Sequence, residues 1–360
     1  MNVTSIEPKY LISYTGYSFV DAGGLVIEYL LSKAELKGMN ILQLISWVTD
    51  LYVDEWNLPL HALLPASPAV VFEYDNERKK QEILHYFREM LREQGAVTVA
   101  RCFVIGNVEP LFASRRYAFM LAGTQQQNDL QNPPNAPVSK FVLIRLFFAL
   151  FGMQRLTGVM YSPYSDNAIL NRHIIFQNCE ANFRFVSAGA TRGAPRPGNI
   201  YPSWQVFILA DYYLEVLDKR TQHEVVSDPG ISLYYWRNTA EEPQITKYLL
   251  TANAFAFYRY CMLAFPEVWK GFMLGYTKAD RRKFMFNYET GQWETKAGEG
   301  VTFQDIIQWP NTVTDALLHG RSLLPYFKKW CLIRSFPVEI VYQYAIIVRN
   351  SLDTSFKKLK

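Results

Sequence analysis

The side chains that could do acid–base chemistry are scattered along this chain and form no known catalytic motif. Its five histidines, His61, His85, His173, His223 and His319, make no HExxH and no His-Asp doublet of the metal-nuclease kind. The sequence also contains no GxxxxGK(S/T) phosphate loop and no GxSxG serine elbow. Because catalytic sites rest on such constellations, the sequence predicts a protein that is not an enzyme.

Cysteines and clustered acids could bind metal ions, but neither group has the spacing of a structural site. Four cysteines stand alone: Cys102, Cys179, Cys261 and Cys331. Structural zinc needs four converging ligands, which CxxC pairs usually supply. Asp50, Asp54 and Glu55 could bind Mg²⁺ from one face of a helix, or could form a solvated helix end, which we expect. The sequence therefore predicts no metal and no cofactor.

Two polar loops carry arginines and amides, which are residue types suited to nucleic acid. One is the Gly/Pro-rich loop 188–202 and the other is the loop 123–137. Their candidate contacts are Arg192, Arg196 and Asn199 in the first loop and Asn128, Gln131 and Asn132 in the second. Arginine makes bidentate contacts to phosphate and guanine, and amides can bind adenine edges. Either loop could instead be a plain solvent-exposed connection, so DNA contact is a hypothesis for each.

Charge is distributed unevenly, although the formal net charge is only +4. Residues 21–93 hold twelve acidic and seven basic residues. Residues 110–210 hold three acids and nine bases, and residues 321–360 hold two acids and eight bases. The candidate phosphate contacts among these bases are Arg115, Arg116, Lys140, Lys328 and Lys329. Segments of this kind can neutralise phosphates and release counterions, or can form a solvated basic face without a ligand.

Helical and extended patterns alternate in the segments that position these residues. Apolar periodicity and end signals predict helices over 21–33, 39–52, 77–94, 139–156, 203–217 and 246–265, and further helices from 302 onward. Extended patterns predict a strand at 97–105, two short strands around Asn178 within 172–187, two strands at 224–237 turning at Asp228-Pro229-Gly230, and a hairpin at 280–293 turning near Gly291. Ser203 is the expected N-cap of its helix, and a break near Pro337 divides the last helices.

This pattern predicts an α+β fold, with a mixed helix and strand body over 1–300 and a basic C-terminal helical element over 301–360. The most apolar stretch, residues 141–153, contains Arg145 and is shorter than the ~20 residues that span a bilayer. No basic segment followed by an apolar run opens the sequence. We therefore expect no signal peptide, no membrane partner and a cytoplasmic protein.

The segment YTGYSFVDAG at residues 14–23 resembles a T-G-x-x-F-V-D-A-G motif. That motif opens the large subunits of type I-B CRISPR surveillance complexes of the Tneap subtype. Its matching positions include Thr15, Gly16, Phe19, Asp21 and Gly23. From the residues themselves we expect a structural role, because glycines permit turns and Asp21 can cap the helix that follows.

The resemblance implies a large subunit without catalytic groups, and its partners would be crRNA and target double-stranded DNA. Such a subunit recognises the protospacer-adjacent motif, assists duplex opening and R-loop formation, and recruits a downstream effector. The effector is either a nuclease-helicase or a transposition adaptor. Relatives are usually longer and many carry CxxC pairs, so the departures here suggest a short variant of the kind found in transposon-associated systems.

A second hypothesis stays open beside the first. The chain could be a structural subunit that touches only partner proteins. Its aromatic residues, 15% of the chain, would then be interface anchors, and its arginines would meet acidic neighbours.

Overall fold

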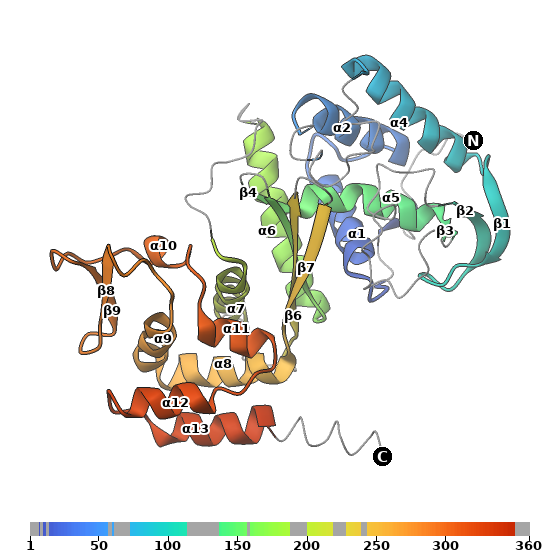
Figure 1. The fold of residues 1–360 in the computed structure, drawn as a ribbon. Helices are drawn as coiled ribbons and strands as arrows, with labels where there is room; N and C mark the ends of the chain where they lie inside the picture. Colours follow the sequence, from blue (N-terminus) through green and yellow to red (C-terminus); the bar gives the residue numbers. More distant parts are fainter. Residues whose placement is uncertain are drawn as a thin grey trace. The chain divides into compact units, whose positions relative to one another are not determined.

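The structure is a computed structural model that describes residues 7, 10–11, 14–56, 60, 73–113, 137–156, 159–187, 200–218, 228–238 and 243–349. These residues divide into two compact units. The first unit draws on 1–164, 168–195 and 234–246, and the second on 165–167, 196–233 and 247–360. The sequence suggested a boundary between a body and a C-terminal element at residue 300. The described residues on either side of that position belong to the same unit, the second. The predicted α+β class, with helices at the C-terminal end, is confirmed (Figure 1).

The first unit is built from helices around two small sheets. Its helices are α1 (Ser18–Leu31), α2 (Ile41–Asp54), α4 (Asn76–Leu91), α5 (Lys140–Ala149), the 3₁₀ turn η6 (Leu150–Gly152) and α6 (Ala168–Ser187). One antiparallel sheet has the order β1-β2-β3 (Ala96–Arg101, Val108–Phe112, Val138–Ser139). The other has the order β4-β5-β6-β7 (Gln154–Leu156, Val159–Ser165, Ile231–Asn238, Pro243–Leu250). Strands β5, β6 and β7 each include residues of both units.

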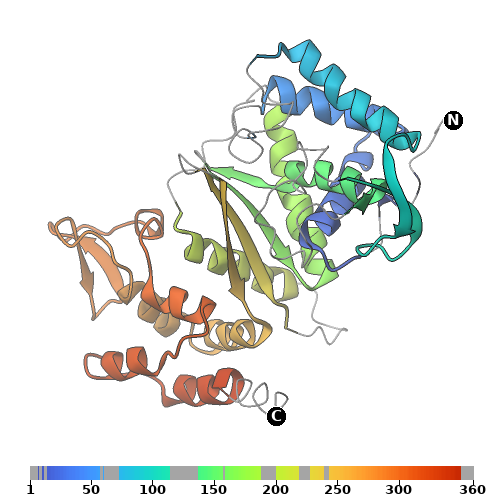
Figure 2. The same cartoon turned by 45° about the vertical axis from the view of Figure 1, so that its right-hand side comes forward.

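The second unit consists of helices, one hairpin and the adjoining ends of β5, β6 and β7 (Figure 2). Its helices are α7 (Pro202–Asp218), α8 (Ala252–Ala264), α9 (Pro266–Gly275), α10 (Phe303–Ile306), α11 (Thr312–Leu318), α12 (Leu324–Cys331) and α13 (Val338–Tyr344), which runs into the π-helical turn η7 (Ala345–Arg349). The antiparallel hairpin pairs β8 (Phe284–Asn287) with β9 (Gln292–Thr295). Gly291 has φ +74° in its turn, as the predicted hairpin requires.

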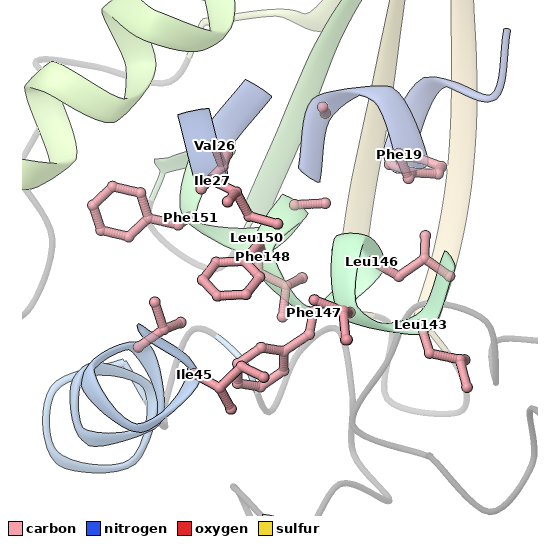
Figure 3. Packing of buried hydrophobic residues seen from close by; sticks show 14 of the residues in the cluster. Phe19, Val26, Ile27, Ile45, Leu143, Leu146, Phe147, Phe148, Leu150 and Phe151 are labelled. Atoms are coloured by element: carbon pink, nitrogen blue, oxygen red, sulfur yellow. The ribbon is translucent and has the colours of Figure 1, made fainter. Parts of the chain in front are cut away.

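The core of the first unit surrounds α5, whose residues Phe141–Ala149 are all buried. Side chains of α1 and α2 face it in Figure 3, among them Val26 and Ile45. The Trp56 ring stacks on Phe151 with centroids 5.6 Å apart. Burial of this many large apolar side chains, each contributing roughly 1.5–3 kcal/mol, is the main stabilisation of the unit.

The helices predicted at 39–52 and 77–94 are present as α2 and α4. Both combine an apolar period with clear signals at their ends. Asn40 and Gln43 form a capping box at the start of α2. The Asp75 side chain accepts from the Arg78 N–H at 2.7 Å and so caps α4, and Gly95 follows the helix with φ +81°.

The two strands predicted at 172–187 are wrong, because this segment is part of the helix α6. The inner face of α6 includes the buried amides of Asn171, Asn178 and Asn182. The Asn182 Nδ2 donates to the carbonyls of Phe151 and Met153 at 2.7 and 2.9 Å. Polar residues on the buried face broke the apolar period, so the helical signal was lost.

Three further boundaries differ from the predictions. Residues 246–250 belong to strand β7, so the helix predicted at 246–265 begins only at Ala252. The helix predicted at 139–156 ends in the turn η6 and passes into β4. Two strands were predicted at 224–237. The described residues of this segment, from Asp228 onward, contain one strand, β6, which lies between β5 and β7 in the sheet. The residues before Asp228 lie outside the described part of the chain.

Ser203 is not an N-cap, because α7 already begins at Pro202. Proline suits a first helical position, where its missing N–H would have no partner. The buried Ser203 hydroxyl instead shares a hydrogen bond of 2.9 Å with the Thr314 hydroxyl. It therefore ties α7 to α11.

The segment Thr15–Gly23 forms a turn followed by the first turns of α1. The Asp21 carboxylate accepts from Thr15 N and Thr15 Oγ1, both at 2.7 Å, and from Gly16 N at 3.0 Å. Asp21 thus caps the turn before the helix and not the helix start that the sequence suggested. Gly16 has φ +78°, as expected for a turn glycine. Phe19 packs against Tyr234 with ring centroids 4.8 Å apart.

Gly23 lies inside α1, so its role is close packing and not the predicted turn. A Cβ at this position would lie 1.7 Å from the carbonyl oxygen of Arg145. Glycine therefore lets α1 and α5 cross with their backbones in contact.

Burial is the largest effect on the Asp21 carboxyl and raises its pKa, whereas the hydrogen bonds from Thr15 and Gly16 and the Arg145 charge lower it.

Glu180 on α6 gives the first unit a testable dependence on pH. Lys33 Nζ and Tyr29 Oη both donate to Glu180 Oε2 at 2.6 Å, and Arg184 Nε donates to Oε1 at 2.9 Å. The Lys33 hydrogen bond is the largest of the effects that lower the Glu180 pKa to about 2. Because the folded-state pKa lies below the unfolded value, this stabilisation is complete above pH ~4.5 and is lost as the pH falls toward 2.

We expect Glu180→Gln to flatten the pH dependence of unfolding in that window. Urea unfolding of the full chain at pH 5, 4 and 3 measures this slope. The exposed Glu35 provides the control Glu35→Gln. Equal slopes for wild type and Glu180→Gln would show that the three contacts add no net stability.

Candidate nucleic-acid interface

Most of the sequence-predicted DNA contacts lie outside the described part of the chain. These are Arg192, Arg196 and Asn199 of the loop 188–202, Asn128, Gln131 and Asn132 of the loop 123–137, and the preceding Arg115 and Arg116. The structure places the remaining three, Lys140, Lys328 and Lys329. Lys140 belongs to the first unit and the two other lysines to the second.

Lys140, the first residue of α5, is engaged within the protein. Its Nζ donates to Glu93 Oε1 at 2.8 Å, and only 15% of its side chain is exposed. The ammonium also lies 5.6 Å from the centre of the Phe141 ring. Its charge is therefore largely compensated before any ligand arrives.

Other bases of the segment 110–210 are engaged in the same way. Arg145 is buried in the core and donates through Nε to the Tyr10 carbonyl at 3.0 Å. Arg172 forms an ion pair of 2.7 Å with Glu28. The net charge of the segment thus overstates the positive charge that its described residues present to solvent.

Helix α12 of the second unit presents Lys328 and Lys329 to solvent. Its other side is apolar, with Phe327 and Trp330 buried. Among the described residues, no carboxylate lies within ion-pair distance of either lysine. Adjacent exposed ammonium groups of this kind suit contacts to a phosphate backbone.

Aromatic packing holds α12 in place. The Trp330 ring lies 5.4 Å from Phe272, 5.9 Å from Tyr276 and 5.8 Å from Tyr288, measured between centroids. Arg334 Nη1 donates to the Tyr288 carbonyl at 2.9 Å and so joins the segment after α12 to the β8–β9 hairpin. The two lysines therefore stand on a rigid support.

A second basic segment, Arg281-Arg282-Lys283, precedes β8 in the same unit, and the sequence reasoning did not single it out. All three residues are exposed. Arg282 is paired with Asp280, whose Oδ1 lies 3.1 Å from its Nε, and this hydrogen bond lowers the Asp280 pKa. Three consecutive bases at the start of the predicted hairpin segment 280–293 are the signal that could have found them.

Exposed apolar side chains also lie near the end of the described chain. Leu332, directly after α12, is 81% exposed. Val338, Tyr342 and Ile346 are exposed at intervals of four residues along α13 and η7. This spacing places them on one side of the helix.

Metal binding finds no support among the residues that the structure describes. No group of three or more His, Cys, Asp or Glu side chains there could hold an ion. At the acidic cluster on α2, Lys80 Nζ lies 3.0 Å from Asp50 and 2.6 Å from Asp54. A lysine therefore occupies the place that a cation would take.

Among the helices that the structure describes, none combines the length and the apolar composition that a membrane span requires.

Comparisons with protein-family models, with curated proteins and with solved structures found no match to this chain.

Proposed function

We propose that this chain is a non-catalytic large subunit of a crRNA-guided DNA-targeting complex. In this role it contacts the protospacer-adjacent motif, assists duplex opening, stabilises the R-loop and recruits a downstream nuclease-helicase or transposition adaptor. The resemblance of residues 14–23 to the T-G-x-x-F-V-D-A-G motif supports the proposal. Other subunits of the complex would be its partners, in the cytoplasm.

The observation that carries the proposal is the pair of exposed lysines, Lys328 and Lys329, on the rigid helix α12. Two adjacent ammonium groups attract a phosphate backbone without selecting a base. The displaced strand of an opened duplex is such a ligand. The base-selective contacts of the proposal belong to the polar loops, which lie outside the described residues.

The double charge reversal Lys328→Glu with Lys329→Glu tests this contact. We expect binding of short duplexes to weaken by about 10- to 100-fold, and the slope of log K against log salt to flatten by about 2. The loss should be equal for duplexes with different flanking motifs, because phosphates carry no base identity. Fluorescence anisotropy of the full chain over a salt series measures all three quantities.

The matched control is Lys37→Glu with Arg92→Glu, which makes the same change in net charge at exposed cations of the first unit. An equal loss in this control would mean that only overall charge matters. A changed preference for flanking motifs in the α12 variant would mean that α12 contacts bases. Either result contradicts the assignment.

The exposed apolar residues Leu332, Val338 and Tyr342 favour the second candidate, a subunit that contacts only proteins. Apolar side chains spaced along one side of a helix are typical of interface anchors. If the α12 reversal leaves DNA binding unchanged and alters only assembly with other subunits, this second function is the correct one.

A further inference from the structure

A pocket of about 290 Å³ opens within the second unit, away from the residues assigned above. It lies among α7, α8, α9 and α10, and its walls are mainly aromatic and aliphatic, including Trp204, Phe207, Met273 and Phe303. Only three lining residues are polar: Asp211, Tyr258 and Lys270. Apolar walls with a few converging polar groups are typical of sites for small planar ligands.

The Asp211 carboxylate is held in place and retains accepting capacity. Tyr258 Oη donates to Asp211 Oδ1 at 2.5 Å, as an ionised carboxylate can only accept. Among the described residues, no donor reaches Asp211 Oδ2. Burial is the largest effect on Asp211 and raises its pKa, whereas the Lys270 charge lowers it. A carboxylate in such surroundings is stabilised by a ligand that donates hydrogen bonds.

Trp204 forms one wall of the pocket. Its side chain lines the pocket and is 3% exposed. Its Nε1–H has no hydrogen-bond partner in the part of the chain that the structure describes. Buried donors in folded proteins nearly always have an acceptor. The Trp204 nitrogen is itself closed off from solvent, so the indole serves as an apolar wall and Asp211 is the polar group that a ligand meets.

Phe303 offers a stacking surface at the mouth. Its ring meets Trp204 edge to face at a centroid distance of 5.8 Å, and 47% of the residue remains exposed. Lys270, also exposed, adds a positive charge to the lining. With Lys270 facing Asp211, the pocket favours a neutral ring with an attached anion over a simple cation.

Guanine fits these requirements better than the other bases. Its N1–H and N2–H₂ are adjacent donors that a single carboxylate can accept together. Cytosine and adenine place an acceptor beside their amino group, and thymine and uracil flank their single N–H with two carbonyls. Guanine also carries O6 and N7, which are acceptors.

We propose that this pocket holds an unpaired guanine of a nucleic-acid strand, stacked on Phe303, hydrogen-bonded to Asp211, and with its phosphate near Lys270. The proposal rests on the proposed function, because it takes the strand from an opened duplex. It adds base selectivity, which the lysines of α12 do not provide. Stacking of one base contributes roughly 1–3 kcal/mol and is itself tolerant of sequence, so the selectivity lies in Asp211.

The test is binding of the full chain to short oligothymidines that carry one central guanine, adenine or cytosine. We expect wild type to prefer guanine about tenfold, the lower end of discrimination by a bidentate contact. Asp211→Asn should abolish this preference and leave binding to plain oligothymidine unchanged. Glu215→Gln, an exposed acid one turn further along α7, makes the same charge change outside the pocket and should preserve the preference.

Phe303→Ala keeps the test decisive if Asp211→Asn fails to fold, because this side chain is half-exposed. It should weaken binding of the guanine oligonucleotide several-fold. We also expect guanine binding to change the fluorescence of Trp204 in wild type, and Phe303→Ala should remove this change. GMP should compete with the oligonucleotide, whereas AMP and inorganic phosphate should not. A wild type without guanine preference, or a preference that survives Asp211→Asn, overturns the proposal.

Failure of this proposal can be distinguished from failure of the proposed function. Loss of guanine preference with an intact salt-dependent effect of Lys328 and Lys329 removes only the pocket. An intact guanine preference with no effect of the α12 reversal upholds the pocket and removes the duplex-opening role of α12. Displacement of the guanine oligonucleotide by a peptide rich in aromatic residues, but not by GMP, would identify a protein ligand and overturn the assignment.

Discussion

Replacing Gly23 with alanine is expected to prevent stable folding of the first unit. The new Cβ would lie 1.7 Å from the carbonyl oxygen of Arg145 and 2.4 Å from its carbonyl carbon. Both are backbone atoms of α5, so no side-chain rotation can relieve the overlap. Overpacking usually costs about 1–3 kcal/mol, and separation of two packed backbones should exceed that range, to about 4–5 kcal/mol or more.

The measurement is urea unfolding of the full chain, followed by circular dichroism, together with the soluble yield. Gly300→Ala is the control, because no atom lies within 4 Å of a Cβ built at that position. It should change stability by no more than about 0.5 kcal/mol. A Gly23→Ala protein as stable as this control would show that α1 and α5 do not cross as described.

Asp21→Ala is expected to cost about 3 kcal/mol or more. The carboxylate accepts from two backbone N–H groups, of Thr15 and Gly16, and from the Thr15 hydroxyl. Alanine removes the acceptor from all three donors, which are only part-buried, so each lost hydrogen bond costs roughly 1 kcal/mol. It also removes the negative charge that faces the buried guanidinium of Arg145.

A graded series separates these contributions. Asp21→Asn keeps one acceptor oxygen but loses the charge, so its cost should lie between those of wild type and Asp21→Ala. Thr15→Val removes the hydroxyl that donates to Asp21 and accepts from the Tyr17 N–H, but keeps both backbone donors to Asp21, so it should cost least. A double-mutant cycle of Asp21→Asn with Arg145→Met measures the charge coupling, which we expect to be about 1 kcal/mol or more. Zero coupling would mean that the two charges do not stabilise each other.

Both expectations assign a structural role to the T-G-x-x-F-V-D-A-G segment. Gly23 permits the crossing of α1 with α5, and Asp21 holds the preceding turn. Neither residue is free to bind DNA, so the nucleic-acid contacts of the proposed function must come from other surfaces. The exposed lysines of α12 and the pocket beside Asp211 are such surfaces.

Local sequence determined those elements whose signals are local. The caps and apolar period of α2 and α4, Gly291 in the hairpin turn and Pro337 before α13 all act within a few residues. The α+β class follows from the sum of such elements. The exposed position of Lys328 and Lys329 on α12 is also a local property, because the apolar residues around them share a helical period.

Tertiary structure decided what depends on residues far apart in the chain. Helix α6 escaped detection because asparagines on its inner face are satisfied by carbonyls of residues 151–153, about thirty positions earlier. Arg172 finds Glu28 across 144 positions, and Lys140 finds Glu93 across 47, so a count of charges could not show which bases remain available. The pocket beside Asp211 joins residues from 204 to 303. Burial and pairing are properties of the packed chain, and only the fold brings their partners within bonding distance.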